Sequence, residues 1–182
     1  MARPTTTLVL ALRETADRLA QSTARYQWSH FAHCNCGHLA QTVTRLPPVV
    51  IYEAAFRRPG DWGEQAAAFE APDYGDRPAL DEGAWEPDNP RCLATGAPLD
   101  DVFAALYAIG LCADDIRHLE RLSDEAVLRR LGKNTTGLAY GDRANVVAYL
   151  RAWADLLEDA LRRETTGRLD EVSDVELPLA AE

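Results

Sequence analysis

The sequence predicts an all-α protein, an irregular bundle of about six or seven helices with one long Pro/Gly-rich loop. Three observations predict this fold class. Apolar residues recur at intervals of three and four in several segments, as they do on the buried face of a helix. Residues that cap or end helices stand at the ends of those segments. We find no alternation of apolar and polar residues long enough to predict a strand.

The first predicted helix spans about residues 6–24. Leu8, Leu12 and Leu19 recur at helical spacing and form its apolar stripe. Thr5 stands directly before this segment and is a residue type that favours the N-cap position. We therefore expect one face of this helix to pack against the core.

Two shorter helices are predicted at about residues 37–46 and 49–57. The first ends at Pro47 and Pro48, because proline cannot continue a helix that precedes it. Pro48 can open the second, since proline is tolerated in the first turn of a helix. The apolar residues expected to face the core are Leu39, Val43, Leu46, Ile51 and Ala55.

A long Pro/Gly-rich loop is predicted at residues 59–98. This segment contains six of the ten prolines and five of the eleven glycines of the chain. A loop of this length is uncommon in a compact domain and is typically a lid or a binding segment. We expect one short helix within it, at about residues 64–69.

Four further helices are predicted, beginning near Asp100, Asp114, Ser123 and Asp142. The last is the clearest, with Asp142 as its N-cap and its end near Glu164. Its expected core face contains Val146, Leu150, Trp153, Leu157 and Leu161.

These elements predict a single helical domain at residues 1–166, within which residues 59–98 form the long loop or lid. An acidic, flexible tail is expected at residues 167–182. Acidic residues but no basic ones follow Leu169, and such a segment at a chain end has little apolar surface to bury.

The charge of the chain limits its partners. The formal net charge is −10 at pH 7, so nucleic acid and anionic membrane surfaces are repelled. No apolar run approaches the ~20 residues that a membrane-spanning helix needs, and the run from Leu8 to Leu12 is too short for a signal peptide. We therefore expect a cytoplasmic protein with reduced cysteines, whose protein partner is a second copy of the chain or a basic protein.

One short stretch concentrates the residues that bind metals or attack electrophiles. Residues 30–38 hold three of the four histidines and two of the four cysteines of the chain. Imidazole and thiolate are ligands that suit zinc, so we predict that this cluster binds one transition metal ion, with Zn²⁺ as the first choice. The predicted ligands are His33, Cys34, Cys36 and His38, with Cys92 and His30 as the next candidates.

Spacing restricts which of these side chains can share one ion. In a continuous helix His30 and His38 would lie roughly 12 Å apart along the axis, too far for one tetrahedral ion. A break at residues 35–37 would instead form a compact turn in which the ligands converge. Such a site could be structural, or it could hold a water molecule for hydrolysis; the sequence identifies no substrate.

Three other interpretations remain open. Cys36 lies in the first turn of the helix that follows Asn35, where the helix dipole lowers a thiol pKa. It could be the nucleophile of a metal-free thiol enzyme, with His38 or His33 as its base. Cys34 and Cys36 could also cycle between dithiol and disulfide. In the third interpretation the chain is a helical protein-interaction module and the cluster has no chemical role.

Overall fold

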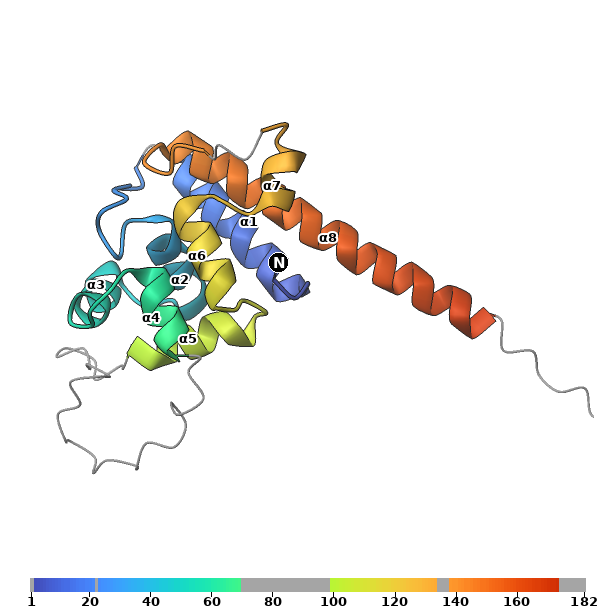
Figure 1. The fold of residues 1–182 in the computed structure, drawn as a ribbon, viewed down its shortest axis with the longest axis horizontal. Coiled ribbons are helices and arrows are strands. Elements are labelled where there is room, and N and C mark those ends of the chain that lie inside the picture. Colours follow the sequence, from blue (N-terminus) through green and yellow to red (C-terminus); the bar gives the residue numbers. More distant parts are fainter. Residues whose placement is uncertain (1, 22, 70–98, 134–137, 174–182) are drawn as a thin grey trace, which may run out of the picture.

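The computed structural model describes residues 2–21, 23–69, 99–133 and 138–173. These residues form eight α-helices and no strand, which confirms the predicted all-α fold (Figure 1). The helices are α1 (Thr6–Ala20), α2 (Asn35–Thr44), α3 (Pro48–Phe56), α4 (Trp62–Phe69), α5 (Leu99–Ala108), α6 (Ala113–Arg121), α7 (Glu125–Arg130) and α8 (Arg143–Ser173).

Helices α1 and α8 form the most extensive helix pair. α1 begins as predicted, because the side chain of Thr5 accepts a hydrogen bond from the Leu8 backbone N–H at 3.0 Å. The apolar stripe of α1 is buried, as are Trp153 and Leu157 of α8. Each large apolar side chain that is buried in this way stabilises the fold by about 1.5–3 kcal/mol.

Helix α2 lies among four neighbours and contacts α1, α3, α5 and α6. A buried pair of hydroxyl groups joins it to α1, with Thr15 Oγ1 2.8 Å from Thr42 Oγ1. Helix α4 packs mainly on α6. Both α3 and α4 lie at the end of the body away from the free end of α8 (Figure 1).

Several helix ends differ from the prediction; α2, for example, begins at Asn35 and ends at Thr44, two residues earlier at each end than predicted. α1 ends at Ala20, about one turn earlier than predicted. α7 is capped by Asp124 rather than by Ser123. Asp124 Oδ1 accepts hydrogen bonds from the N–H groups of Ala126 and Val127, at 2.9 and 3.1 Å.

The start of α8 is confirmed and its end is not. Asp142 Oδ1 accepts the Ala144 N–H at 2.8 Å. The helix continues through Ser173, well past the predicted end near Glu164. Arg162 pairs with Glu158, one turn earlier, at 2.8 Å.

The predicted loop at residues 59–98 contains α4, so its short helix is confirmed and begins two residues earlier than predicted, at Trp62. Residues 70–98 lie outside the described residues. In the part of the chain that the structure describes, no helix combines the length and the apolar character needed to cross a bilayer.

Candidate functional site

Residues 26–38 form a compact turn that runs into α2, and we call it the 26–38 turn. The backbone N–H of His33 donates to the carbonyl of His30 at 2.9 Å, which turns the chain back on itself. Where the turn touches α2, a Cβ at Gly37 would lie 2.0 Å from the Phe31 carbonyl oxygen. This close approach of two backbone segments therefore requires glycine.

Cys34 is the N-cap of α2 and is buried. Its Sγ accepts a hydrogen bond from the Gly37 N–H at 3.4 Å and donates one to the Phe31 carbonyl at 3.3 Å. Burial raises the pKa of the Cys34 thiol to about 12. Cys34 is therefore a neutral thiol that caps a helix.

Cys36 lies in the first turn of α2, as predicted, but only 1% of it is exposed. Its Sγ donates to the Ile116 carbonyl of α6 at 3.6 Å. Burial, with the neighbouring Cys34, raises the pKa of the Cys36 thiol well above its ordinary value. The helix dipole does not overcome this burial, so Cys36 does not meet the requirements of a thiolate nucleophile.

His38 is also buried, with 4% exposed. Its Nε2 donates to the Arg25 carbonyl at 2.9 Å, and its Nδ1 has no hydrogen-bond partner among the described residues. Burial lowers the pKa of His38 to about 4. The ring is therefore neutral, and no hydrogen bond of the described structure joins it to Cys36 as a base.

His30 and His33 lie at the outer side of the 26–38 turn and are partly exposed. Their ring centroids are 4.4 Å apart, and the His30 ring stacks on Tyr52 of α3 at 4.3 Å. Partial burial lowers the pKa of His33, and the charges of His30 and Arg25 lower it further. The ring stack joins the turn to α3.

The predicted metal site is wrong. No three or more His, Cys, Asp or Glu side chains of the described residues are grouped so that they could hold a metal ion. The predicted ligands are His30, His33, Cys34, Cys36, His38 and Cys92. Cys92 lies outside the described residues. Cys34, Cys36 and His38 have separate backbone partners, and His30 and His33 pack on each other. Crowding in the sequence therefore arises from separate packing roles.

A cavity that the sequence did not predict lies beside this cluster. It has a volume of about 150 Å³ and forms where the 26–38 turn, the start of α4 and the end of α6 meet. Its lining residues are Trp28, Ser29, Phe31, Cys34, Asp61, Trp62 and Glu120. We call it the Trp/acid pocket.

Hydrogen bonds to the backbone hold both tryptophan side chains of the pocket in place. Trp28 Nε1 donates to the Glu120 carbonyl at 3.3 Å, and Trp62 Nε1 donates to the Phe31 carbonyl at 3.2 Å. The Trp28 ring also packs on Tyr140, with 4.5 Å between centroids. These rings are therefore fixed by the fold itself.

Glu120 brings a buried carboxyl group to the pocket, with 7% of the residue exposed. Its Oε2 accepts a hydrogen bond from the Gly63 N–H at 3.3 Å. Burial raises the pKa of Glu120, and the nearby Asp61 raises it further. Glu120 forms no ion pair with any described residue, and the adjacent Arg121 pairs with Asp61.

Asp61 and Arg121 lie at the edge of the pocket. Arg121 donates to Asp61 at 2.9 Å, and its guanidinium carbon lies 5.9 Å from the centroid of the Trp28 ring. Burial raises the pKa of Asp61, but the Glu64 backbone N–H and Arg121 outweigh this, so the pKa lies below its ordinary value. The edge of the pocket thus already holds one cation, which belongs to the protein.

Asn35 joins the predicted cluster to this pocket. Its fully buried amide donates to the carbonyls of Leu119 and Glu120, at 2.8 and 3.1 Å. Its Oδ1 accepts a hydrogen bond from the Tyr26 hydroxyl at 2.6 Å. The start of α2 therefore fixes the backbone of Glu120 and, with it, one wall of the pocket.

The signals for this pocket in the sequence are weak. Trp28 and Trp62 lie outside the predicted apolar stripes, which is compatible with a pocket wall. Nothing singles out Glu120, because an acidic residue of an amphipathic helix normally faces solvent. Its burial follows from the docking of α4 on α6.

Comparisons of the chain with protein-family models, with curated proteins and with solved structures gave no match. The functional assignment therefore depends on the geometry of the Trp/acid pocket.

Proposed function

We propose that the Trp/acid pocket binds the head group of a small organic cation, such as a methylated ammonium group. The observation that carries this proposal is the carboxyl group of Glu120, which is buried beside two tryptophans without an ion-pair partner among the described residues. A buried carboxylate without a countercharge is costly. A cation in the cavity would reduce that cost.

The aromatic lining favours an organic cation over a metal ion. Trp and Phe rings attract cations through their quadrupoles, by about 2 kcal/mol when the cation is desolvated. A metal ion instead needs several oxygen, nitrogen or sulfur ligands in a defined geometry. The chain already contains one organic cation bound in this way: the guanidinium of Arg121 lies over the Trp28 ring and pairs with the carboxylate of Asp61.

The volume of the pocket limits the ligand to a small group. Pockets for drug-sized ligands measure about 300–1,000 Å³, whereas this cavity measures about 150 Å³. A head group of a few heavy atoms matches that space. The rest of the ligand would extend past Asp61 and Ser29, which are less buried than Trp62 at the pocket floor.

The local charge also favours a cation. Asp61 and Glu120 bring two carboxyl groups to the pocket, and Arg121 brings one positive charge beside it. When both carboxyl groups are ionised, a monocation makes the site neutral. A neutral or anionic ligand leaves the excess negative charge uncompensated.

Tryptophan fluorescence tests the proposal without a label. Titration of the full chain with tetramethylammonium, choline or trimethyllysine should give a saturable change. Glu120→Gln keeps an acceptor for the Gly63 N–H but removes the charge, and should abolish the response. Glu125→Gln alters an exposed residue of α7 and is the matched control. If no monocation in this panel gives saturable binding, the proposal is wrong.

A further inference from the structure

One oxygen of the buried Glu120 carboxyl group is left unused in the Trp/acid pocket. Glu120 is 7% exposed, and its Oε2 accepts the Gly63 N–H at 3.3 Å. The Trp62 N–H also lowers the pKa of this carboxyl group, but no described residue donates a hydrogen bond to the second oxygen, Oε1. Oε1 is not enclosed by the protein, so it can be reached from the cavity that Glu120 lines. A ligand in the pocket can therefore donate to it.

The other polar side chains of the pocket already have partners. Asp61 Oδ1 accepts the Glu64 N–H, and Asp61 Oδ2 accepts a hydrogen bond from Arg121, both at 2.9 Å. The thiol of the pocket and its two indole N–H groups are bonded to backbone groups. Ser29 is exposed, so water can satisfy its hydroxyl group. Among the described side chains that line the pocket, Glu120 Oε1 is thus the one buried acceptor that a ligand can use.

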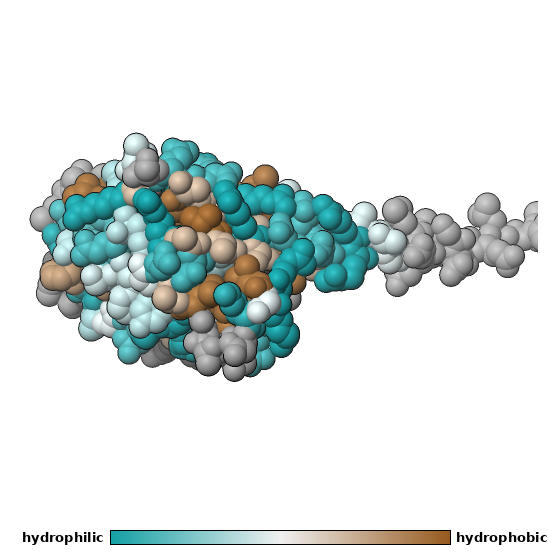
Figure 2. Space-filling view, turned by 90° about the horizontal axis from the view of Figure 1, so that it is seen from above, coloured by the Kyte–Doolittle hydropathy of each residue, from teal (hydrophilic) through white to brown (hydrophobic). Residues whose placement is uncertain are grey.

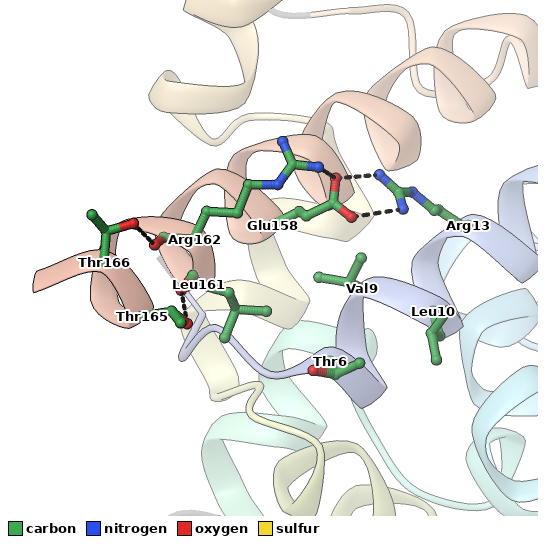
Figure 3. A pocket seen from close by; sticks show the side chains of 9 residues that line it. All are labelled: Thr6, Val9, Leu10, Arg13, Glu158, Leu161, Arg162, Thr165 and Thr166. Carbon is green, nitrogen blue, oxygen red and sulfur yellow. Dashed lines mark hydrogen bonds and ion pairs between the residues drawn. The ribbon is translucent and has the colours of Figure 1, made fainter. Parts of the chain in front are cut away.

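The larger groove between α1 and α8 offers no such acceptor among its described side chains (Figure 3). Both oxygens of its carboxylate, Glu158, accept hydrogen bonds from Arg13, at 3.2 and 3.0 Å, and Arg162 donates to the same group. Thr165 and Thr166 donate to carbonyls within α8. The described surface of α8 past this groove is largely hydrophilic (Figure 2). Of these two cavities, the Trp/acid pocket is the one whose described residues specify a ligand.

A single free acceptor matches a cation that carries a single N–H. A primary ammonium group brings three N–H donors, and two of them would lack a buried side-chain acceptor in this cavity. A trimethylammonium group brings none, so Oε1 would lose contact with water without gaining a hydrogen bond. A dimethylammonium group can donate its one N–H to Oε1 and place its methyl groups against Trp28, Phe31 and Trp62.

We infer that the ligand of the Trp/acid pocket is a protonated dimethylamino group, R–NH⁺(CH₃)₂, whose N–H donates a charge-assisted hydrogen bond to Glu120 Oε1. This inference rests on the cation site proposed above and names the chemical class that the site selects. The cavity of about 150 Å³ takes the dimethylammonium head group, and the substituent R leaves it past Asp61 and Ser29. The head group is the same in a free amine and in a dimethylated lysine side chain of a protein.

Isothermal titration calorimetry of the full chain at pH 7 with three related amines tests the class. N,N-dimethylethanolamine, choline and ethanolamine share one substituent R and differ only in the methyl groups on nitrogen. The Kd of dimethylethanolamine should be about tenfold lower than that of either other compound. Glu120→Gln should abolish this preference. Glu125→Gln, at an exposed position of α7, is the matched control and should keep it.

The outcomes separate this inference from the cation site itself. Choline or ethanolamine that binds as tightly as dimethylethanolamine, or more tightly, overturns the single hydrogen bond to Oε1 and leaves the cation site standing. Absence of saturable binding by all three compounds overturns both.

Capped lysine amides with no, two or three methyl groups on the side-chain nitrogen distinguish the two sources of the ligand. The dimethylated compound should again bind most tightly, and a trimethylated compound that binds more tightly overturns the inference. A Kd for dimethyllysine below that of dimethylethanolamine assigns the site to a protein side chain, and a Kd above it assigns the site to a free amine.

Discussion

Glu120 Oε2 accepts a hydrogen bond from the Gly63 backbone N–H at 3.3 Å, which joins the last turn of α6 to the first turn of α4. The helices approach closely here, because a Cβ at Gly63 would lie 3.1 Å from the Cβ of Arg117. Glycine at this position lets α4 cover Glu120. The contact therefore explains why a charged residue of an amphipathic helix is buried at the Trp/acid pocket.

Glu120→Gln should change binding and stability in opposite directions. Because the pKa of Glu120 is raised in the folded state, the fold binds the proton more tightly than the unfolded chain does. The resulting penalty on folding is fully present above the folded-state pKa, decreases as the pH falls below it, and is gone below the pKa of the unfolded chain. The variant should therefore unfold at a higher denaturant concentration than the wild type at pH 7, while it loses cation binding.

The control for this prediction is Glu125→Gln, which should leave both quantities unchanged at this exposed position. A Glu120→Gln variant that is less stable than the wild type at pH 7 would show that the carboxylate mainly stabilises the fold.

Arg121→Gln should tighten cation binding. Arg121 pairs with Asp61 and lies over Trp28, so its positive charge competes with that of a ligand. Its removal should lower the Kd for tetramethylammonium by about tenfold, with a steeper dependence on salt. Arg129→Gln in α7 is the matched control. Weaker binding by the Arg121 variant would mean that the guanidinium helps to build the pocket.

Gly37→Ala should destabilise the protein by about 3 kcal/mol or more, because the new Cβ would lie 2.0 Å from the Phe31 carbonyl oxygen. Gly141→Ala is the control, since no atom lies within 4 Å of its new Cβ. Its effect should stay within about 0.5 kcal/mol. Urea unfolding measures both values, and similar stabilities of the two variants would disprove the close contact at the 26–38 turn.

His38 should make the fold sensitive to mild acid. Its folded-state pKa of about 4 lies below the ~6.5 of an unfolded histidine. Its contribution to stability is thus fully present above about pH 6.5 and is lost as the pH falls toward 4. Over this window His38→Gln should lose about 1–3 kcal/mol less stability than the wild type.

The control for acid sensitivity is His118→Gln, at a partly exposed ring that pairs with Ser123. Parallel pH profiles for wild type and His38→Gln, from urea unfolding, would show that His38 does not cause the loss.

Thiol reactivity should follow burial. Cys112 is exposed, whereas Cys34 and Cys36 are buried. The pKa of all three thiols is raised, so exposure is what distinguishes Cys112. An alkylating reagent should label Cys112 in the native protein, and Cys34 and Cys36 only after unfolding. Peptide mass spectrometry measures each rate. Native labelling of Cys36 as fast as that of Cys112 would support the thiol-enzyme interpretation.

Local signals account for the part of the fold that the sequence predicted. The N-cap Asp142 and the apolar stripe that follows depend on residues within a few positions of each other. Both appear in α8 as expected down to Leu157, whereas Leu161, the last residue of the predicted stripe, is only half-buried. The extension to Ser173 carries no apolar stripe of the kind that predicted the first part of α8, so its length could not be predicted from periodicity.

Long-range contacts explain why the site could not be predicted. The partner of Cys36 is Ile116, 80 positions away, and that of Glu120 is Gly63, 57 positions away. A run of His and Cys residues looks the same in the sequence whether their side chains share one ion or contact separate partners, so the sequence cannot distinguish the two cases. Here Cys34, Cys36 and His38 bind separate backbone partners, and His30 and His33 pack on each other. The Trp/acid pocket lies beside this cluster.

The most direct test of the Trp/acid pocket compares choline with 3,3-dimethylbutan-1-ol, which has the same shape without the charge. Isothermal titration calorimetry of the full chain should show saturable binding of choline, about tenfold or more tighter than that of the uncharged alcohol. In Glu120→Gln this preference should disappear. Equal affinities of the wild type for the two compounds, or no binding of choline, would contradict a cation site at Glu120.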